Sequence, residues 1–268
     1  MNPKFRDDGL EIFAKDGPPA LPAGGALLDR DGARIWHAHY GAGPAVMLLH
    51  GGMGNANNFG HQVPALIEAG FSVVVVDSRG HGRSSWDGGA FSYSQFATDA
   101  LAVLDRLGIG KVAVVGWSDG ACTGLAMAKA APERIAGVLF FACNVDESGS
   151  VPFVFTETIG NCLTRHKKDY AALSPEPERF EEMSQKLQVM QGTQPDYSAD
   201  DLRSIAVPVI VLQAERDEFI SAEHARYIAD TVTGARYVWL ADVSHFAPVQ
   251  RPEAFNAEVL DFLRNLTF

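Results

Sequence analysis

Cysteine is scarce in this chain. The 268 residues include three cysteines, Cys122, Cys143 and Cys162, and none belongs to a C-x-x-C pair or to another spacing typical of metal ligands. Three thiols cannot form the disulfide framework that stabilises small secreted proteins. The sequence therefore predicts a protein of a reducing compartment, for which we expect a cytoplasmic location, and it predicts no metal site.

Positive charge is also in short supply, because 22 Lys and Arg face 33 Asp and Glu and the net charge is −11. With no excess of cations to contact phosphates, we expect neither nucleic acid nor an anionic membrane as a partner. Long apolar runs are missing as well: Val73–Val76 and Val138–Cys143 are far too short to span a bilayer. No apolar stretch follows the charged segment Met1–Asp8, which therefore does not resemble a signal peptide.

What the chain does have is the composition of a folded domain, with 47% hydrophobic and 21% charged residues. Short apolar runs recur without alternation, which is typical of strands buried on both faces, and helical stretches lie between most of them. The pattern predicts an α/β fold with a mostly parallel, eight-stranded sheet flanked by helices. The expected strands are an N-terminal hairpin of Leu27–Arg30 and Arg34–Tyr40, followed by Ala45–Leu49, Ser72–Val76, Val112–Gly116, Gly137–Ala142, Val207–Leu212 and Tyr237–Leu240.

Three helices are predicted from spacing and from their end signals. Apolar residues recur at helical spacing from Phe96 to Leu107, and Gly108 provides a stop. The segments Ala222–Thr231 and Pro252–Leu266 likewise follow expected strands.

The domain organisation is predicted from breaks and from one long strand-free stretch. Gly17-Pro18-Pro19 interrupts residues 1–25, which we expect to form an irregular N-terminal arm. Residues 26–144 and 206–268 are expected to form the core. About sixty residues between them contain no strand-like run, although strand-to-helix connections are usually short. We therefore expect residues 145–205 to form a small helical cap over the active-site edge of the sheet.

One helix of this cap is predicted in detail. Ser174 is expected to be its N-cap and Pro175 to lie in its first turn, followed by acidic residues near the positive helix end. Met183, Leu187 and Met190 then give the helix an apolar face.

The segment Gly116-Trp117-Ser118-Asp119-Gly120 has the pattern G-x-S-x-G. It directly follows an expected strand and precedes a helix of small residues, the context in which this pattern forms a nucleophile elbow. The alternative is an ordinary glycine-rich turn. In this context the pattern indicates that Ser118 is a nucleophile.

A serine nucleophile needs a base and a carboxylate that orients the base. His245 and Asp217 each follow a late expected strand, and the chain order Ser, Asp, His is that of the hydrolase arrangement. Asp217 is our choice of carboxylate, although Glu215, Glu218 and Asp242 also lie near these turns.

The reaction also needs two backbone N–H groups that stabilise an oxyanion. His50-Gly51-Gly52-Met53-Gly54 follows an expected strand, and its glycines have no side chain to keep the backbone away from a substrate. We expect the N–H groups of Gly52 and Asp119 to form the oxyanion hole, and Met53, Trp117 and Asp119 to contact the substrate.

Together these motifs resemble the α/β-hydrolases of the esterase and lactonase type. The resemblance extends from about Leu27 to Phe268, and Asp77-Ser78-Arg79-Gly80-His81-Gly82-Arg83-Ser84 also carries it. The Gly-Trp-Ser-Asp-Gly elbow and Ala142-Cys143-Asn144 are locally similar to the valacyclovir hydrolase family, also called biphenyl hydrolase-like, which cleaves α-amino-acid esters. The resemblance implies serine-hydrolase chemistry but leaves the substrate open, because carbon–carbon bond hydrolases and enol-lactonases share this framework.

Other polar residues are interpreted as structural. In a hydrolase fold Asp77–Ser84 is a connection whose side chains satisfy backbone groups, so His81 is not expected to be the base. His50 is expected to support the oxyanion loop. The remaining histidines, His166 of the cap among them, share no metal-ligand spacing.

Asp119 stands out because a carboxylate beside the nucleophile opposes the formation of an oxyanion. One interpretation is that it binds a substrate amine. The other is that it bonds to backbone or to a cap residue such as Arg165, Lys167 or Lys168.

The sequence thus predicts a serine hydrolase that cleaves a small carboxylic ester or lactone, and among these an α-amino-acid ester is one candidate. It needs no cofactor, and its partner is a small-molecule substrate. Two alternatives are a carbon–carbon bond hydrolase of the same fold and a hydrolase-fold receptor with little turnover. The oligomeric state is left open between monomer and homodimer.

Overall fold

The computed structural model describes residues 7–268. The first six residues of the predicted arm, and with them most of the segment that does not resemble a signal peptide, lie outside that range. None of the helices within residues 7–268 is both long and apolar enough to cross a membrane.

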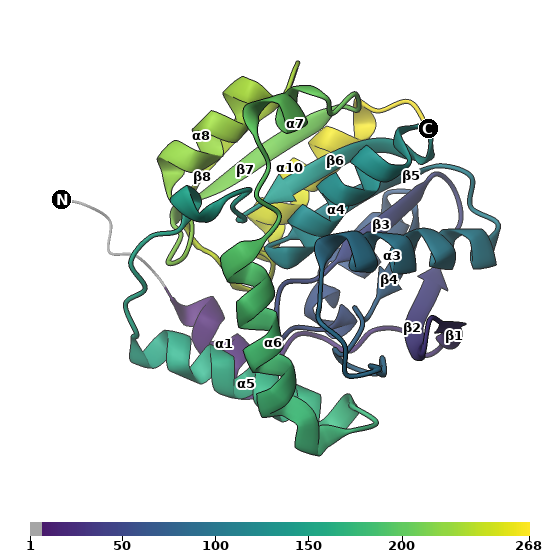
Figure 1. Cartoon of the computed structure of the whole chain (residues 1–268), viewed down its shortest axis with the longest axis vertical. Coiled ribbons are helices and arrows are strands. Elements are labelled where there is room, and N and C mark those ends of the chain that lie inside the picture. Colours follow the sequence, from purple (N-terminus) through teal and green to yellow (C-terminus); the bar gives the residue numbers. More distant parts are fainter. Residues whose placement is uncertain (1–6) are drawn as a thin grey trace.

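A single eight-stranded sheet runs through the centre of the molecule, in the order β1-β2-β4-β3-β5-β6-β7-β8 (Figure 1). All eight strands overlap the predicted ones, and the α/β fold is confirmed. Their bounds are Ala26–Arg30 for β1, Ala33–Tyr40 for β2, Ala45–Leu49 for β3, Ser72–Val76 for β4, Val112–Trp117 for β5, Ile135–Phe141 for β6, Val209–Arg216 for β7 and Arg236–Ser244 for β8. The largest differences are at the C-terminal ends of the last two strands, which each extend four residues beyond the predicted Leu212 and Leu240.

The strand directions bring the loops that carry the predicted site residues to one edge of the sheet. The pairs β1–β2 and β2–β4 are antiparallel, and the strands from β4 across to β8 are parallel. The strands β3 and β5 are neighbours, with Leu49 opposite Gly116. The loop after Leu49 and the turn after Gly116 therefore begin side by side, at the point where the strand order reverses direction.

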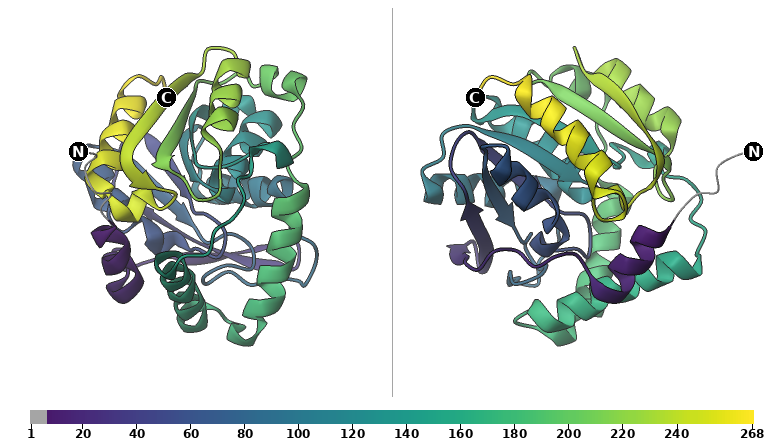
Figure 2. Two further views of the ribbon diagram at one scale, coloured as in Figure 1. Left: turned by 90° about the vertical axis from the view of Figure 1, so that its left-hand side faces the viewer. Right: turned by 180° about the vertical axis from the view of Figure 1, so that it is seen from behind.

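Helices cover both faces of the sheet, and alternate strand residues contact opposite sets of them (Figures 1 and 2). Met47 and Leu49 pack in the core with α3, α4 and α8, whereas Val46 and Leu48 pack with α1, α2, α9 and α10. The core and N-terminal helices are α1 Asp8–Asp16, α2 Gln62–Glu68, α3 Tyr93–Leu107, α4 Asp119–Ala130, α8 Ala222–Thr231, α9 Ala247–Gln250 and α10 Pro252–Arg264, and the short 3₁₀ turns among them are Ala56–Phe59 and Pro132–Arg134. The predicted stop at Gly108 is a left-handed cap with φ +69°.

The predicted irregular arm is wrong in part, because α1 lies within it. The side chains of Leu10 and Phe13 are buried, and the helix packs against α5, Glu157–Leu173 (Figure 2). Gly17, at φ +75°, ends α1. The breaker residues therefore follow the helix rather than prevent it.

The segment 145–205 is helical, but the start predicted for one of its helices, at Ser174 and Pro175, is wrong. Ser174 follows α5, and its hydroxyl accepts a hydrogen bond from the Glu176 N–H. The next helix, α6, begins only at Phe180, after a 3₁₀ turn. Ser174 therefore ends α5 and does not cap α6. The apolar face of α6 is confirmed, since Met183, Leu187 and Met190 are buried. The elements of this segment are the 3₁₀ turn Glu147–Gly149, α5, the 3₁₀ turn Pro177–Arg179, α6 Phe180–Thr193 and α7 Ala199–Arg203.

Candidate active site

Ser118 lies in a strained turn between β5 and α4. Its φ of +54° and ψ of −125° belong to a backbone region that residues with a side chain rarely adopt. Glycine is required on both sides of it. A Cβ at Gly116 would lie 2.4 Å from the Cα of Ala121, and one at Gly120 would lie 2.0 Å from the carbonyl oxygen of Leu49. The two glycines thus permit the elbow that the sequence predicts, and the Ser118 hydroxyl forms no hydrogen bond with any described residue.

His245 and Asp217 meet at the same edge of the sheet, after β8 and β7. The His245 Nδ1–H donates to Asp217 Oδ1 over 3.0 Å, and both side chains are buried. The same oxygen accepts the backbone N–H groups of Phe219 and Ile220, each at 3.0 Å, which fixes the carboxylate. This arrangement leaves the lone pair of a neutral His245 on Nε2, the nitrogen that a general base needs.

Two other carboxylates near these turns bind backbone instead. Glu218 accepts the His245 backbone N–H at 3.0 Å, and Glu215 accepts that of Asp242 at 2.8 Å. Among the described residues, Asp217 is therefore the carboxylate that contacts the imidazole. Burial alone would lower the pKa of His245, but the charge and hydrogen bond of Asp217 hold it above its ordinary value.

The predicted oxyanion donors lie beside the serine. A Cβ on Gly51 would lie 3.0 Å from the Cβ of Ser118, so the loop after β3 approaches Ser118 closely. Within residues 7–268 the N–H groups of Gly52 and Asp119 have no hydrogen-bond acceptor. Unpaired backbone donors near a nucleophile are what an oxyanion hole requires.

Ser118, His245, Gly52 and Asp119 line one cavity of about 310 Å³, a volume that suits a small molecule. Met53 and Trp117, which the sequence predicts as substrate contacts, are part of its wall. The full lining is Gly51, Gly52, Met53, Gly54, Asn58, Tyr93, Trp117, Ser118, Asp119, Cys143, Asn144, Ser150, Val151, Phe153, Leu163, His166, Gln191, Phe219, Ile220, His245 and Phe246.

Comparison with known proteins agrees with this arrangement. A model of the alpha/beta hydrolase fold matches residues 44–175. A non-heme haloperoxidase of Rhodococcus erythropolis is 26% identical over 273 aligned residues, which cover 88% of this chain and 97% of the relative. The human serine hydrolase BPHL is 27% identical over 248 residues, which cover 87% of this chain and 84% of the relative. The bromoperoxidase of Bacillus anthracis superposes with a TM-score of 0.75 at 19% identity, over 90% of this chain and 100% of its own.

The chain belongs to the α/β-hydrolase superfamily. The resemblance read from the motifs is thereby confirmed. Family membership and these relatives indicate an enzyme that hydrolyses esters or related bonds.

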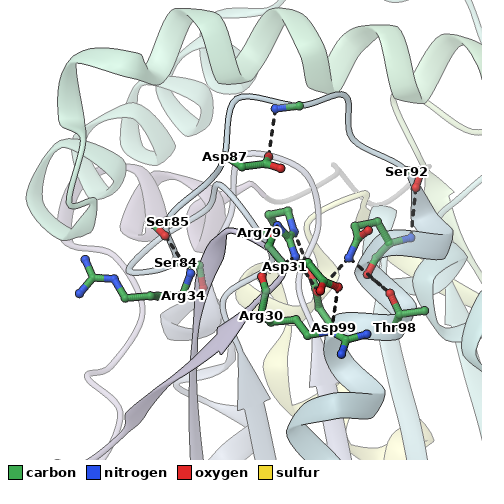
Figure 3. Close-up of polar contacts among 12 residues, drawn as sticks. Arg30, Asp31, Arg34, Arg79, Ser84, Ser85, Asp87, Ser92, Thr98 and Asp99 are labelled. Atoms are coloured by element: carbon green, nitrogen blue, oxygen red, sulfur yellow. Dashed lines mark hydrogen bonds and ion pairs between the residues drawn. The ribbon is translucent and has the colours of Figure 1, made fainter.

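In this hydrolase the segment after β4 holds the core together, as expected for Asp77–Ser84. The Asp77 carboxylate accepts the N–H groups of Ala56 and Arg83, each at 2.7 Å, and Ser84 donates to the Asp77 carbonyl. The Arg79 guanidinium forms a two-pronged ion pair with Asp99 of α3, with both N···O distances 2.9 Å (Figure 3).

His50 also has a supporting position. Its Nε2 accepts the Ser78 N–H at 3.0 Å, and its Nδ1–H donates to the Gly51 carbonyl at 2.8 Å. Both ring nitrogens therefore hold the loop after β3, the predicted oxyanion loop, in place. Burial lowers the pKa of His50 to about 4 and that of His81 to about 3, so both rings are neutral at pH 7.

These buried rings predict a loss of stability in acid. Burial also lowers the pKa of His166 to about 4, whereas an unfolded chain protonates histidine near 6.5. Below pH 6.5 the unfolded state binds more protons than the folded state, so the free energy of unfolding falls between pH 6.5 and about 4. Each ring contributes up to about 1.4 kcal/mol per pH unit.

Urea unfolding of wild type and His81→Gln at several pH values between 4.5 and 7.5 measures this slope. The variant should show the shallower slope. His39→Gln, which changes an exposed histidine, is the control and should match wild type. Equal slopes for wild type and His81→Gln would show that His81 is not held neutral by burial.

Asp119 has partners that the sequence did not identify. Its side chain is buried, and it accepts the Tyr93 hydroxyl at 2.8 Å and the Gln191 amide of α6 at 3.0 Å. Two of the three cap cations considered as partners are engaged elsewhere, because Arg165 pairs with Asp169 and Lys167 with Glu181. Burial raises the pKa of Asp119. No cation of the described residues contacts it.

Sequence reasoning missed several residues of the cavity wall. Tyr93 and Gln191 carried no motif, since their importance comes from a contact with Asp119 far away in the chain. Phe219 could have been found by its position two residues after Asp217, and its ring packs 4.7 Å from that of His245. His166 was assigned to the cap, but the structure also places it on the cavity wall.

Proposed function

We propose that this protein is a serine hydrolase that cleaves small carboxylic esters or lactones through an acyl-enzyme. The observation that carries the proposal is that Ser118, the Asp217-bound His245 and the unpaired N–H groups of Gly52 and Asp119 line one small cavity. Nucleophile, oriented base and oxyanion donors are the three parts that acyl transfer needs.

In the proposed reaction the Ser118 oxygen attacks the ester carbonyl while His245 Nε2 takes the hydroxyl proton. The tetrahedral oxyanion accepts the N–H groups of Gly52 and Asp119. His245 then gives the proton to the leaving alcohol, and the acyl group stays on Ser118. Water attacks the acyl-enzyme with His245 as base, which releases the acid and restores Ser118. Asp217 stabilises the imidazolium throughout.

For the acyl group we propose an α-amino acid. Asp119 is a buried carboxylate on the cavity wall with two neutral hydrogen-bond donors and, among the described residues, no cation. A substrate ammonium would supply the missing positive charge. The local resemblance of the elbow to hydrolases of amino-acid esters supports the same choice.

The test compares kcat/KM for L-alanine ethyl ester and its N-acetyl twin, with wild type and Asp119→Asn. Wild type should prefer the free amine about 10- to 100-fold, the range expected for a hydrogen bond to a charged group. The preference should collapse in the variant. Turnover of the N-acetyl ester should persist, because the oxyanion donor of residue 119 is its backbone N–H.

Two other outcomes would each contradict a different part of the proposal. If wild type cleaves both esters alike, the amine assignment is wrong and neutral esters and lactones take its place. If it cleaves neither, ester hydrolysis itself is contradicted.

A further inference from the structure

His166 is a buried histidine that the proposed mechanism does not use. It lies on α5 and lines the cavity from the cap side, and 4% of its surface is exposed. Its ring packs edge-on against Phe13 at 5.5 Å and parallel to Phe246 at 6.3 Å. The ring is thus fixed by aromatic neighbours, although it forms no hydrogen bond with any described residue.

The two ring nitrogens differ in their surroundings. Nδ1 is enclosed and has no hydrogen-bond partner within residues 7–268, whereas Nε2 is not enclosed in this way. The ring is neutral at pH 7 and carries a single N–H. A buried N–H without an acceptor is rarer than a buried lone pair without a donor. The hydrogen therefore belongs on Nε2, which can donate to a molecule in the cavity.

The position of His166 indicates which part of a substrate it meets. The Phe246 ring contacts both the His166 ring and, at 5.8 Å, the His245 ring. Because His245 returns its proton to the leaving oxygen, the leaving group must lie along the wall beside His245. Asp119 and Gln191 form a separate polar part of the wall, where the proposed acyl amine binds.

We propose that His166 is a substrate-binding residue of the cap, whose Nε2–H donates a hydrogen bond to an acceptor oxygen in the leaving group, beyond the ester oxygen. The favoured substrates are then esters of ether-containing or hydroxylated alcohols rather than of plain alkanols. This inference rests on the proposed ester hydrolysis and specifies the substrate of the same site.

The test uses two esters of one amino acid, with 2-methoxyethanol and with n-butanol as leaving groups, so that one oxygen replaces one methylene. The quantity measured is kcat/KM for the methoxyethyl ester divided by kcat/KM for the butyl ester. This ratio is corrected for intrinsic reactivity by dividing it by the same ratio of the hydroxide-catalysed rate constants. Wild type should favour the methoxyethyl ester. His166→Phe keeps an aromatic ring between Phe13 and Phe246 but has no donor, and should lower the ratio about fivefold, the worth of one neutral hydrogen bond. His166→Gln restores an N–H and should recover most of it.

The matched control is Cys162→Ala, which changes a buried residue one turn earlier on α5 that is outside the cavity lining. It should keep the wild-type ratio, because damage to cap packing lowers both rates alike. An unchanged ratio in His166→Phe, with both esters still cleaved in a Ser118-dependent way, overturns the His166 assignment alone. Failure of wild type to cleave either ester overturns the proposed function and the His166 assignment together.

Discussion

Replacing Ser118 by alanine is expected to lower kcat for every ester that the protein cleaves by about 10⁴- to 10⁶-fold. The variant removes the oxygen that attacks the ester carbonyl in the first step of the proposed mechanism. Both unpaired N–H groups and the cavity remain, so residual hydrolysis by bound water and binding of the ester should persist. The measurement is single-turnover and steady-state kinetics with the amino-acid ester, together with the urea midpoint.

The matched control is Ser150→Ala, the same chemical change at another serine of the cavity wall. Its kcat should stay within about tenfold of wild type, because the Ser150 hydroxyl takes no part in the steps proposed. The free energy of unfolding of Ser118→Ala should stay within about 1 kcal/mol of wild type, since the left-handed backbone at residue 118 is unchanged. Wild-type turnover by Ser118→Ala would rule out the acyl-enzyme.

Replacing Arg79 by alanine is expected to lower the free energy of unfolding by about 3–5 kcal/mol. Arg79 and Asp99 are each at most 4% exposed at the side chain, and their two hydrogen bonds are both 2.9 Å long. The guanidinium also donates to the carbonyls of Asp31 and Arg30, which ties the β1–β2 hairpin to α3 (Figure 3). Without Arg79 the Asp99 carboxylate stays buried with the amide of Gln95 as its remaining described donor, at 3.0 Å.

Two further variants separate this effect from a general loss of charge. Arg203→Ala breaks an exposed ion pair with Asp200 and should change the free energy of unfolding by about 0.5 kcal/mol or less. The double variant Arg79→Met with Asp99→Leu removes both charges and should be more stable than Arg79→Ala alone. Urea denaturation of all three measures the differences. A loss below about 1 kcal/mol in Arg79→Ala would contradict the role assigned to the ion pair.

The cap shows where local sequence signals were insufficient. The apolar face of α6 was predicted because Met183, Leu187 and Met190 recur at helical spacing, yet the helix begins at Phe180 rather than after Ser174. A serine, a proline and acidic residues are typical of a helix start, but Ser174 instead ends α5, whose single apolar face is too narrow to be read from spacing. The helix α1 was missed for a related reason, since Leu10 and Phe13 are stabilised by packing against α5.

The sequence by itself determined the sheet, the elbow at Ser118, the glycine loop at Gly52 and the edge at which His245 lies. These features depend on hydrophobic runs, on glycines at tight turns and on the order of the motifs. Each of these signals is contained in a short segment or in the order of segments along the chain. Only the tertiary structure decided which carboxylate contacts His245, that Tyr93 and Gln191 bind Asp119, and that His166 reaches the cavity. The first two depend on contacts between residues 26 to 72 positions apart in the chain. The position of His166 depends on a cavity wall that several elements form together. Such contacts are set by how helices pack on the sheet, which no local pattern encodes.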